Sequence, residues 1–107
     1  MKLTKKNLQA VDEFGRPVTN ITSITVYDAG TTDSKTIYRD KNGEVSITNP
    51  ITTSSANTTL TQHNGQFWFY SYGPDYKIVI TDGTNSRTID NLTNSDSRIL
   101  FASDLSE

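Results

Sequence analysis

The chain of 107 residues contains no cysteine and only one histidine, His63. Without cysteine there is no disulfide and no thiolate chemistry. His63 lies in a polar stretch, one residue before the Asn64-Gly65 turn signal, and it has no cysteine partners for a metal site. A catalytic triad would need this histidine as its base. We interpret His63 as an exposed loop residue, and we expect no catalytic residues, no metal, no cofactor and no enzyme activity.

An excess of basic charge and long apolar runs are also lacking. Ten basic and twelve acidic residues give a formal net charge of −2. Nucleic-acid-binding proteins usually carry a basic patch or stripe, so we expect no nucleic-acid partner. No apolar run approaches the roughly 18 residues of a membrane span. The basic start, Met1 to Asn7, has no apolar core of a signal peptide. These patterns predict no membrane association and synthesis in a cytoplasm.

Apolar residues are scarce as well, at 33% of the chain. Globular proteins usually have about 45–50% with glycine counted. Threonine, serine and asparagine make up the difference, and threonine favours strands whereas asparagine favours turns. A chain of this length forms one domain and buries roughly two-thirds of its unfolded surface. The composition therefore favours a thin sandwich with polar outer faces.

What the sequence does contain is a series of short alternating segments separated by Gly, Asn, Asp and Pro. This pattern is typical of strands joined by tight turns. No segment has a sustained 3.6-residue period, so we expect essentially no helix. The fold class predicted is all-β, with a single antiparallel β-sandwich of about seven strands over residues 11–102. The strand candidates are residues 22–27, 36–38, 44–48, 67–70, 76–80, 87–92 and 98–101. The predicted core is Ile24, Val26, Val45, Ile47, Phe67, Phe69, Tyr76, Ile78 and Ile80.

Three further segments are distinctive. Residues 1–10 contain two large apolar side chains besides the initial methionine, so we expect an N-terminal arm or an edge strand that needs a partner. Residues 51–62 are almost free of apolar side chains and predict either an exposed loop or an edge hairpin. Loops of that length are often functional or mobile. Residues 103–107 form a short acidic tail.

The segment from Asp40 to Glu44 has two interpretations. Its Asn-Gly pair is a hairpin-turn signal. Asp40, Asn42 and Glu44 also offer oxygen atoms, but a calcium loop of the EF-hand type needs about five oxygen-ligand positions. We favour the turn.

The candidate interface residues are Trp68, Tyr70 and Tyr72. In a strand, Phe67 and Phe69 point to one face while Trp68 and Tyr70 point to the other. Either a loop covers the second pair, or the pair lies exposed at a subunit or ligand interface, where Trp and Tyr often dominate the binding energy. The sequence leaves both possibilities open.

Several motifs in this region resemble those of β-sandwich modules in tailed-phage virion proteins. The resemblance covers positions 24–80, and Gly15-Arg-Pro-Val18 also resembles the turn before the first long strand of prealbumin-like sandwiches. The chain departs from the pattern in its long 51–62 stretch and in Gly73-Pro-Asp75, which replaces an Asp-Gly turn. The motifs are Val26-Tyr-Asp-Ala-Gly-Thr31, Thr36-Ile-Tyr-x-Asp-x-x-Gly43, Asn49-Pro-Ile51, Asn64-Gly-x-Phe-x-Phe-Tyr70 and Pro74-Asp-Tyr-x-Ile78.

The resemblance implies an Ig-like or prealbumin-like fold and a structural role in the virion, and it transfers no catalytic residue. Because the chain is short, our first expectation is a capsid decoration or cement protein. It would bind the major capsid protein or other virion proteins as a homo-oligomer, with a trimer favoured. One alternative is a tail, baseplate or head-fibre component. Another is a carbohydrate-binding module that stacks Trp68, Tyr70 and Tyr72 on sugar rings.

Overall fold

The computed structural model describes residues 3–12, 14–54, 57–60, 65–73 and 75–93, together with the backbone of residues 96–100. These residues form strands, turns and irregular segments, and they contain no helix, so the all-β class is confirmed. The described part of the chain therefore offers no helix that could cross a membrane. His63 and the acidic tail at 103–107 lie outside the described residues.

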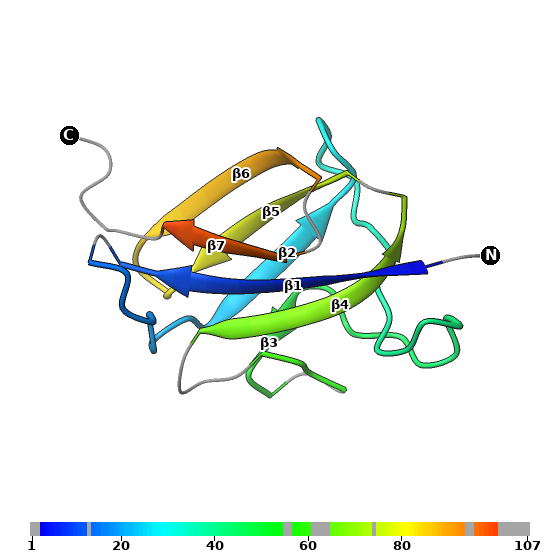
Figure 1. The fold of residues 1–107 in the computed structure, drawn as a ribbon, viewed down its shortest axis with the longest axis horizontal. Coiled ribbons are helices and arrows are strands. Elements are labelled where there is room, and N and C mark those ends of the chain that lie inside the picture. The colour runs from blue at the N-terminus through cyan, green and yellow to red at the C-terminus, as the bar shows by residue number, and fades with distance from the viewer. Residues whose placement is uncertain are drawn as a thin grey trace.

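The strands are arranged in two sheets that form two layers (Figure 1). One sheet has the order β4-β1-β7 and the other has the order β3-β2-β5-β6. Neighbouring strands are antiparallel except β1 and β7, which are parallel. The strands are β1 (Leu3–Val11), β2 (Ser23–Tyr27), β3 (Ile51–Thr52), β4 (Gln66–Tyr72), β5 (Tyr76–Thr81), β6 (Ser86–Leu92) and β7 (Asp96–Leu100).

The start of the chain differs from the expected arm or edge strand at residues 1–10. Strand β1 is the middle strand of its sheet, paired with β4 from Leu3 to Gln9 and with β7 from Asn7 to Val11. Leu8 and Ala10 are buried in the core, and the inward position before them is occupied by Lys6, which is only 2% exposed. The lysine interrupts the apolar alternation, which is why the sequence pattern here looked too weak for a central strand.

Both sheets contribute to one core. The rings of Phe69 in β4 and Tyr76 in β5 meet edge-to-face, with centroids 5.5 Å apart. Of the nine residues expected in the core, all are buried except Val45. The core also takes in side chains from β1, from β3 and from the irregular segments, namely Leu8, Ala10, Ile21, Ile37, Ile51 and Leu60.

The exception, Val45, is 41% exposed, so its assignment to the core is wrong. The expected strand at 44–48 does not form; the segment makes an isolated bridge between Ser46 and Tyr38. The cause is the Asp40 carboxylate, which accepts hydrogen bonds from the backbone N–H groups of Glu44 (2.9 Å) and Val45 (2.8 Å). These bonds extend the turn at residues 40–43 and break the alternation that would have placed Val45 inward with Ile47.

The 51–62 stretch is anchored by its two apolar residues. Ile51 lies in β3, pairs with Ile24 of β2 and is fully buried. Leu60 is also in the core. Between them, the Thr58 hydroxyl donates to the Thr52 carbonyl (2.6 Å) and accepts from the Leu60 N–H (3.2 Å). The described part of this stretch is therefore neither a fully exposed loop nor a hairpin.

Candidate functional site

Strand β4 carries its aromatic side chains on two faces, as the alternation predicts. Phe67 and Phe69 are fully buried, whereas Trp68 and Tyr70 on the opposite face are partly exposed and Tyr72 is 65% exposed. The rings of Trp68 and Tyr70 are edge-to-face, with centroids 6.0 Å apart and planes at 89°. The structure thus places the three predicted interface residues on the outer side of their sheet.

Two cationic side chains lie against Trp68. The Lys5 ammonium is 4.8 Å from the centroid of the indole ring, and the Arg39 guanidinium carbon is 5.9 Å from it. Both lie within the distance at which a cation is attracted to the face of an aromatic ring. Neither cation forms an ion pair with another described residue. We call the surface made by Trp68, Tyr70, Tyr72, Lys5 and Arg39 the aromatic face.

The edge of β4 beside this face is partly covered by other parts of the chain. Tyr38 and Tyr70 exchange two backbone hydrogen bonds, of 2.9 Å and 2.8 Å. The Thr59 hydroxyl donates to the Trp68 carbonyl. Because these backbone groups already have partners, another strand cannot pair with β4 here. Any partner must contact the aromatic face through side chains.

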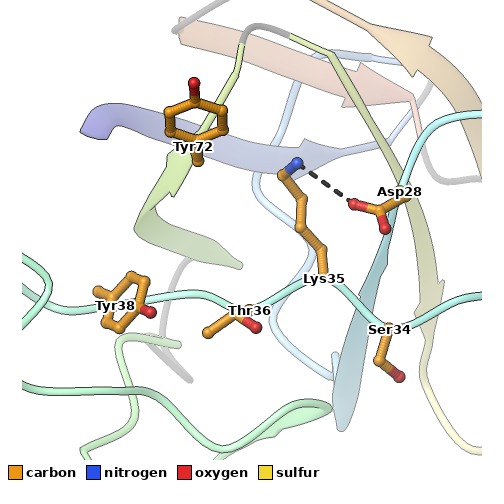
Figure 2. Close-up of a pocket in the computed structure, with 6 residues that line it drawn as sticks. All are labelled: Asp28, Ser34, Lys35, Thr36, Tyr38 and Tyr72. Carbon is orange, nitrogen blue, oxygen red and sulfur yellow. Dashed lines mark hydrogen bonds and ion pairs between the residues drawn. The ribbon is translucent and has the colours of Figure 1, made fainter. Parts of the chain in front are cut away.

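A pocket of about 380 Å³ opens at the end of β4 where Tyr72 lies (Figure 2). The rest of its wall comes from the segment that follows β2. That segment turns at Asp28, whose N–H donates to the Asp33 carbonyl (2.9 Å), and it returns along β2 through a bond from the Lys35 N–H to the Val26 carbonyl (3.0 Å). The lining residues are Asp28, Ser34, Lys35, Thr36, Tyr38 and Tyr72.

An ion pair crosses one side of the pocket. The Lys35 ammonium lies 3.4 Å from a carboxylate oxygen of Asp28, and the two side chains are 13% and 54% exposed respectively. The position of Lys35 is fixed by Asn49, whose amide nitrogen donates to the Lys35 carbonyl (2.9 Å) and to the Val26 carbonyl (2.7 Å). Asn49 also accepts from the Val26 N–H (3.0 Å), so its side chain acts as a strand partner for β2.

A second ammonium group, that of Lys6, is buried nearby. It donates to the carbonyls of Gly73 (2.8 Å) and Ser71 (3.4 Å) and to the hydroxyl of Thr4. Burial lowers the pKa of Lys6, the positive charge of Lys35 lowers it further, and Asp75 partly offsets both effects.

The sequence predicted that Trp68 and Tyr70 share one side of their strand. It did not indicate that Lys5 and Arg39 lie against Trp68, and it did not predict the pocket. Residues 36–38 were predicted to be a short strand, but Tyr38 makes only isolated bridges there. No spacing indicated that residues 28–38 would meet Tyr72. The charged pair Asp28 and Lys35, with Tyr38 just beyond it, was the one available signal. Within the described ranges, no group of three or more His, Cys, Asp or Glu could hold a metal ion.

No family model, curated protein or solved structure matches this chain. The similarity to phage virion modules therefore depends on the motifs quoted above.

Proposed function

We propose that this chain is a non-enzymatic structural protein of a tailed-phage virion, namely a capsid decoration or cement protein. It binds the outer shell as a homo-oligomer, with a trimer as the favoured state. We further propose that the two layers are an Ig-like or prealbumin-like β-sandwich of seven strands. The motifs between positions 24 and 80 support this family. The aromatic face is the observation on which the binding role depends.

The aromatic face has the chemistry of a protein contact surface. Tryptophan, tyrosine and arginine are the residues that most often dominate interface energies. Lys5 and Arg39 reach Trp68 from nearby and have no carboxylate partner among the described residues. A partner that presents acidic side chains around an apolar centre would complement this surface and guide the encounter. We propose such a surface on the major capsid protein or on another virion protein.

The aromatic face is less suited to stacking against sugar rings than to contacting a protein. Stacking on sugars requires open ring faces, but Trp68 and Tyr70 are nearly perpendicular and cations lie over the indole. For this surface we therefore favour a protein partner. A tail, baseplate or head-fibre location remains the second proposal, and it would use the same contacts.

Replacing Trp68 with alanine tests the proposed function. Truncating a buried interfacial tryptophan commonly costs about 2 kcal/mol, which is roughly thirtyfold in affinity. We expect this loss when Trp68→Ala is co-sedimented with virus particles that lack the protein. Separate sedimentation with purified heads and purified tails distinguishes the two virion locations.

The matched control is Phe14→Ala, which removes an aromatic ring that is 74% exposed and lies in the turn after β1. It should bind particles as the unchanged protein does. Thermal melts of both variants show whether the fold is intact. Unchanged binding of a folded Trp68→Ala variant would show that the aromatic face is not the contact surface.

A further inference from the structure

We propose that the pocket between Tyr72 and residues 28–38 binds one uncharged sugar ring. This inference does not rest on the proposed virion role, because it concerns a different ligand and a separate opening; Tyr72 is the one residue that belongs both to the aromatic face and to the pocket wall. The structure offers four observations in its favour, which are the size of the pocket, the separation of aromatic from polar walls, the balance of charge, and the rigid attachment of the walls.

The size suits a single ring. Small-molecule sites in proteins usually have volumes of about 300–1,000 Å³, and this pocket, at about 380 Å³, lies near the lower limit. It is open to solvent through Tyr72, which is 65% exposed. The terminal sugar of an oligosaccharide can therefore enter the pocket while the remaining sugar units stay in water.

The walls differ in character from one side to the other. Figure 2 shows Tyr38 and Tyr72 on one side, Asp28 and Ser34 on the opposite side, and Lys35 and Thr36 between them. A sugar ring has the same division, because its C–H bonds form an apolar face and its hydroxyl groups point outward from the edge. The apolar face suits the tyrosine rings. The hydroxyl groups suit a wall of donors and acceptors.

The charges of the pocket favour an uncharged ligand. Asp28 and Lys35 form a pair, so the pocket wall carries no net charge. A hydroxyl group both donates and accepts, and it can donate to the exposed carboxylate while accepting from the ammonium. The hydroxyl groups of Ser34 and Thr36 can each donate or accept a hydrogen bond. An anionic ligand would be attracted by Lys35 but repelled by Asp28. A cationic ligand would be attracted by Asp28 but repelled by Lys35.

The pocket is held in place before any ligand arrives. Tyr38 is fixed by its two backbone bonds to Tyr70, and Lys35 by its bonds to Val26 and Asn49. Tyr72 belongs to β4, where it pairs with Leu3 of β1. Walls attached to two sheets need little ordering on binding, which lowers the entropy cost.

The test is a titration of the isotope-labelled full chain followed by two-dimensional amide NMR. The probes are glucose, galactose, mannose and N-acetylglucosamine, with glucuronic acid and glucosamine as charged comparisons. We expect at least one uncharged sugar to bind with a dissociation constant on the order of 1 mM, as is usual for a small ligand with few contacts. The shifted amides should be those of residues 34–36 and 72. The charged sugars should bind more weakly.

Tyr72→Ala should weaken binding at least about tenfold, because it removes one aromatic wall. The side chain is exposed, so the fold should be preserved, and the amide spectrum reports this directly. Asp28→Asn is the second variant. It should weaken the binding of the uncharged sugar and strengthen the binding of glucuronic acid. Trp68→Ala, which changes only the aromatic face, should leave sugar binding unchanged.

Three results would overturn the proposal. One is the lack of pocket shifts with every uncharged sugar at roughly ten times the expected dissociation constant. The others are unchanged affinity in a folded Tyr72→Ala variant and tighter binding of a charged sugar by the unchanged protein. Failure of the virion proposal instead appears as normal particle binding by Trp68→Ala, so the two failures are distinguishable.

Discussion

At the scale of single residues, Lys6 is the most unusual side chain in the core. Its ammonium group donates hydrogen bonds to the carbonyls of Ser71 and Gly73, and Lys6 is paired with Phe69 in the sheet register. Lysine can bury its stem and still satisfy its charge in this way. The side chain therefore contributes both apolar packing and hydrogen bonds.

We expect the packing to be the larger contribution. Lys6→Ala should destabilise the protein by roughly 2–4 kcal/mol, since it empties a buried site and removes the ammonium donor to the Gly73 carbonyl. Lys6→Met should cost less than half as much, because its side chain fills a similar space. Lys5→Ala, at the exposed neighbouring position, should change stability by no more than about 0.5 kcal/mol. Urea unfolding measures all three, and equal costs for alanine and methionine would show that the hydrogen bonds dominate.

Tyr76 gives the stability a dependence on alkaline pH. Burial raises the pKa of Tyr76 to about 12. In the unfolded chain the phenol titrates near pH 10, so between about pH 10 and 12 the folded state holds the proton more tightly. The stabilisation is complete below pH 10 and is lost as pH rises, by about 2 kcal/mol at pH 12. Unfolding curves of the unchanged protein and Tyr76→Phe should diverge in this window, and parallel pH profiles would contradict the expectation.

At the scale of elements, the position of β1 has a direct dynamic consequence. A strand paired on both sides and bearing the buried Leu8 and Ala10 should open only with the sheet. In the isolated protein, hydrogen exchange at residues 7–10 should be as slow as at residues 78–80 of β5. Exchange as fast as in the turn at residues 82–85 would instead support the arm that the sequence suggested.

The elements that the sequence predicted well are those with strict alternation. In β4 and β5, large apolar residues occupy every second position from Phe67 to Phe69 and from Tyr76 to Ile80, and burial follows this pattern. The sequence failed where a polar side chain determined the backbone path. Asp40 turned Val45 outward, and Lys6 occupied an inward position that only its carbonyl partners make tolerable.

At the scale of the whole molecule, the two candidate sites differed in how far they could be predicted. The aromatic face belongs mainly to one strand, so its residues are related by a period of two and are visible in the sequence. The pocket joins Tyr72 to a segment more than thirty residues earlier, and Asn49 fixes that segment through side-chain bonds. Such a contact depends on the packing of the sheets, which no local pattern encodes.

The parallel pairing of β1 with β7 also determines how the molecule responds to force. The end of β7, at Leu100, lies beside Val11 at the end of β1, so Leu3 lies at the opposite end of the sheet (Figure 1). A pull applied at the beginning of β1 and the end of β7 slides the two strands past each other. The hydrogen bonds between them are then loaded together in shear, whereas a hairpin pulled at its open end breaks them one after another. The first and last strands thus form a mechanical clamp, and tension along the chain meets it before reaching the core.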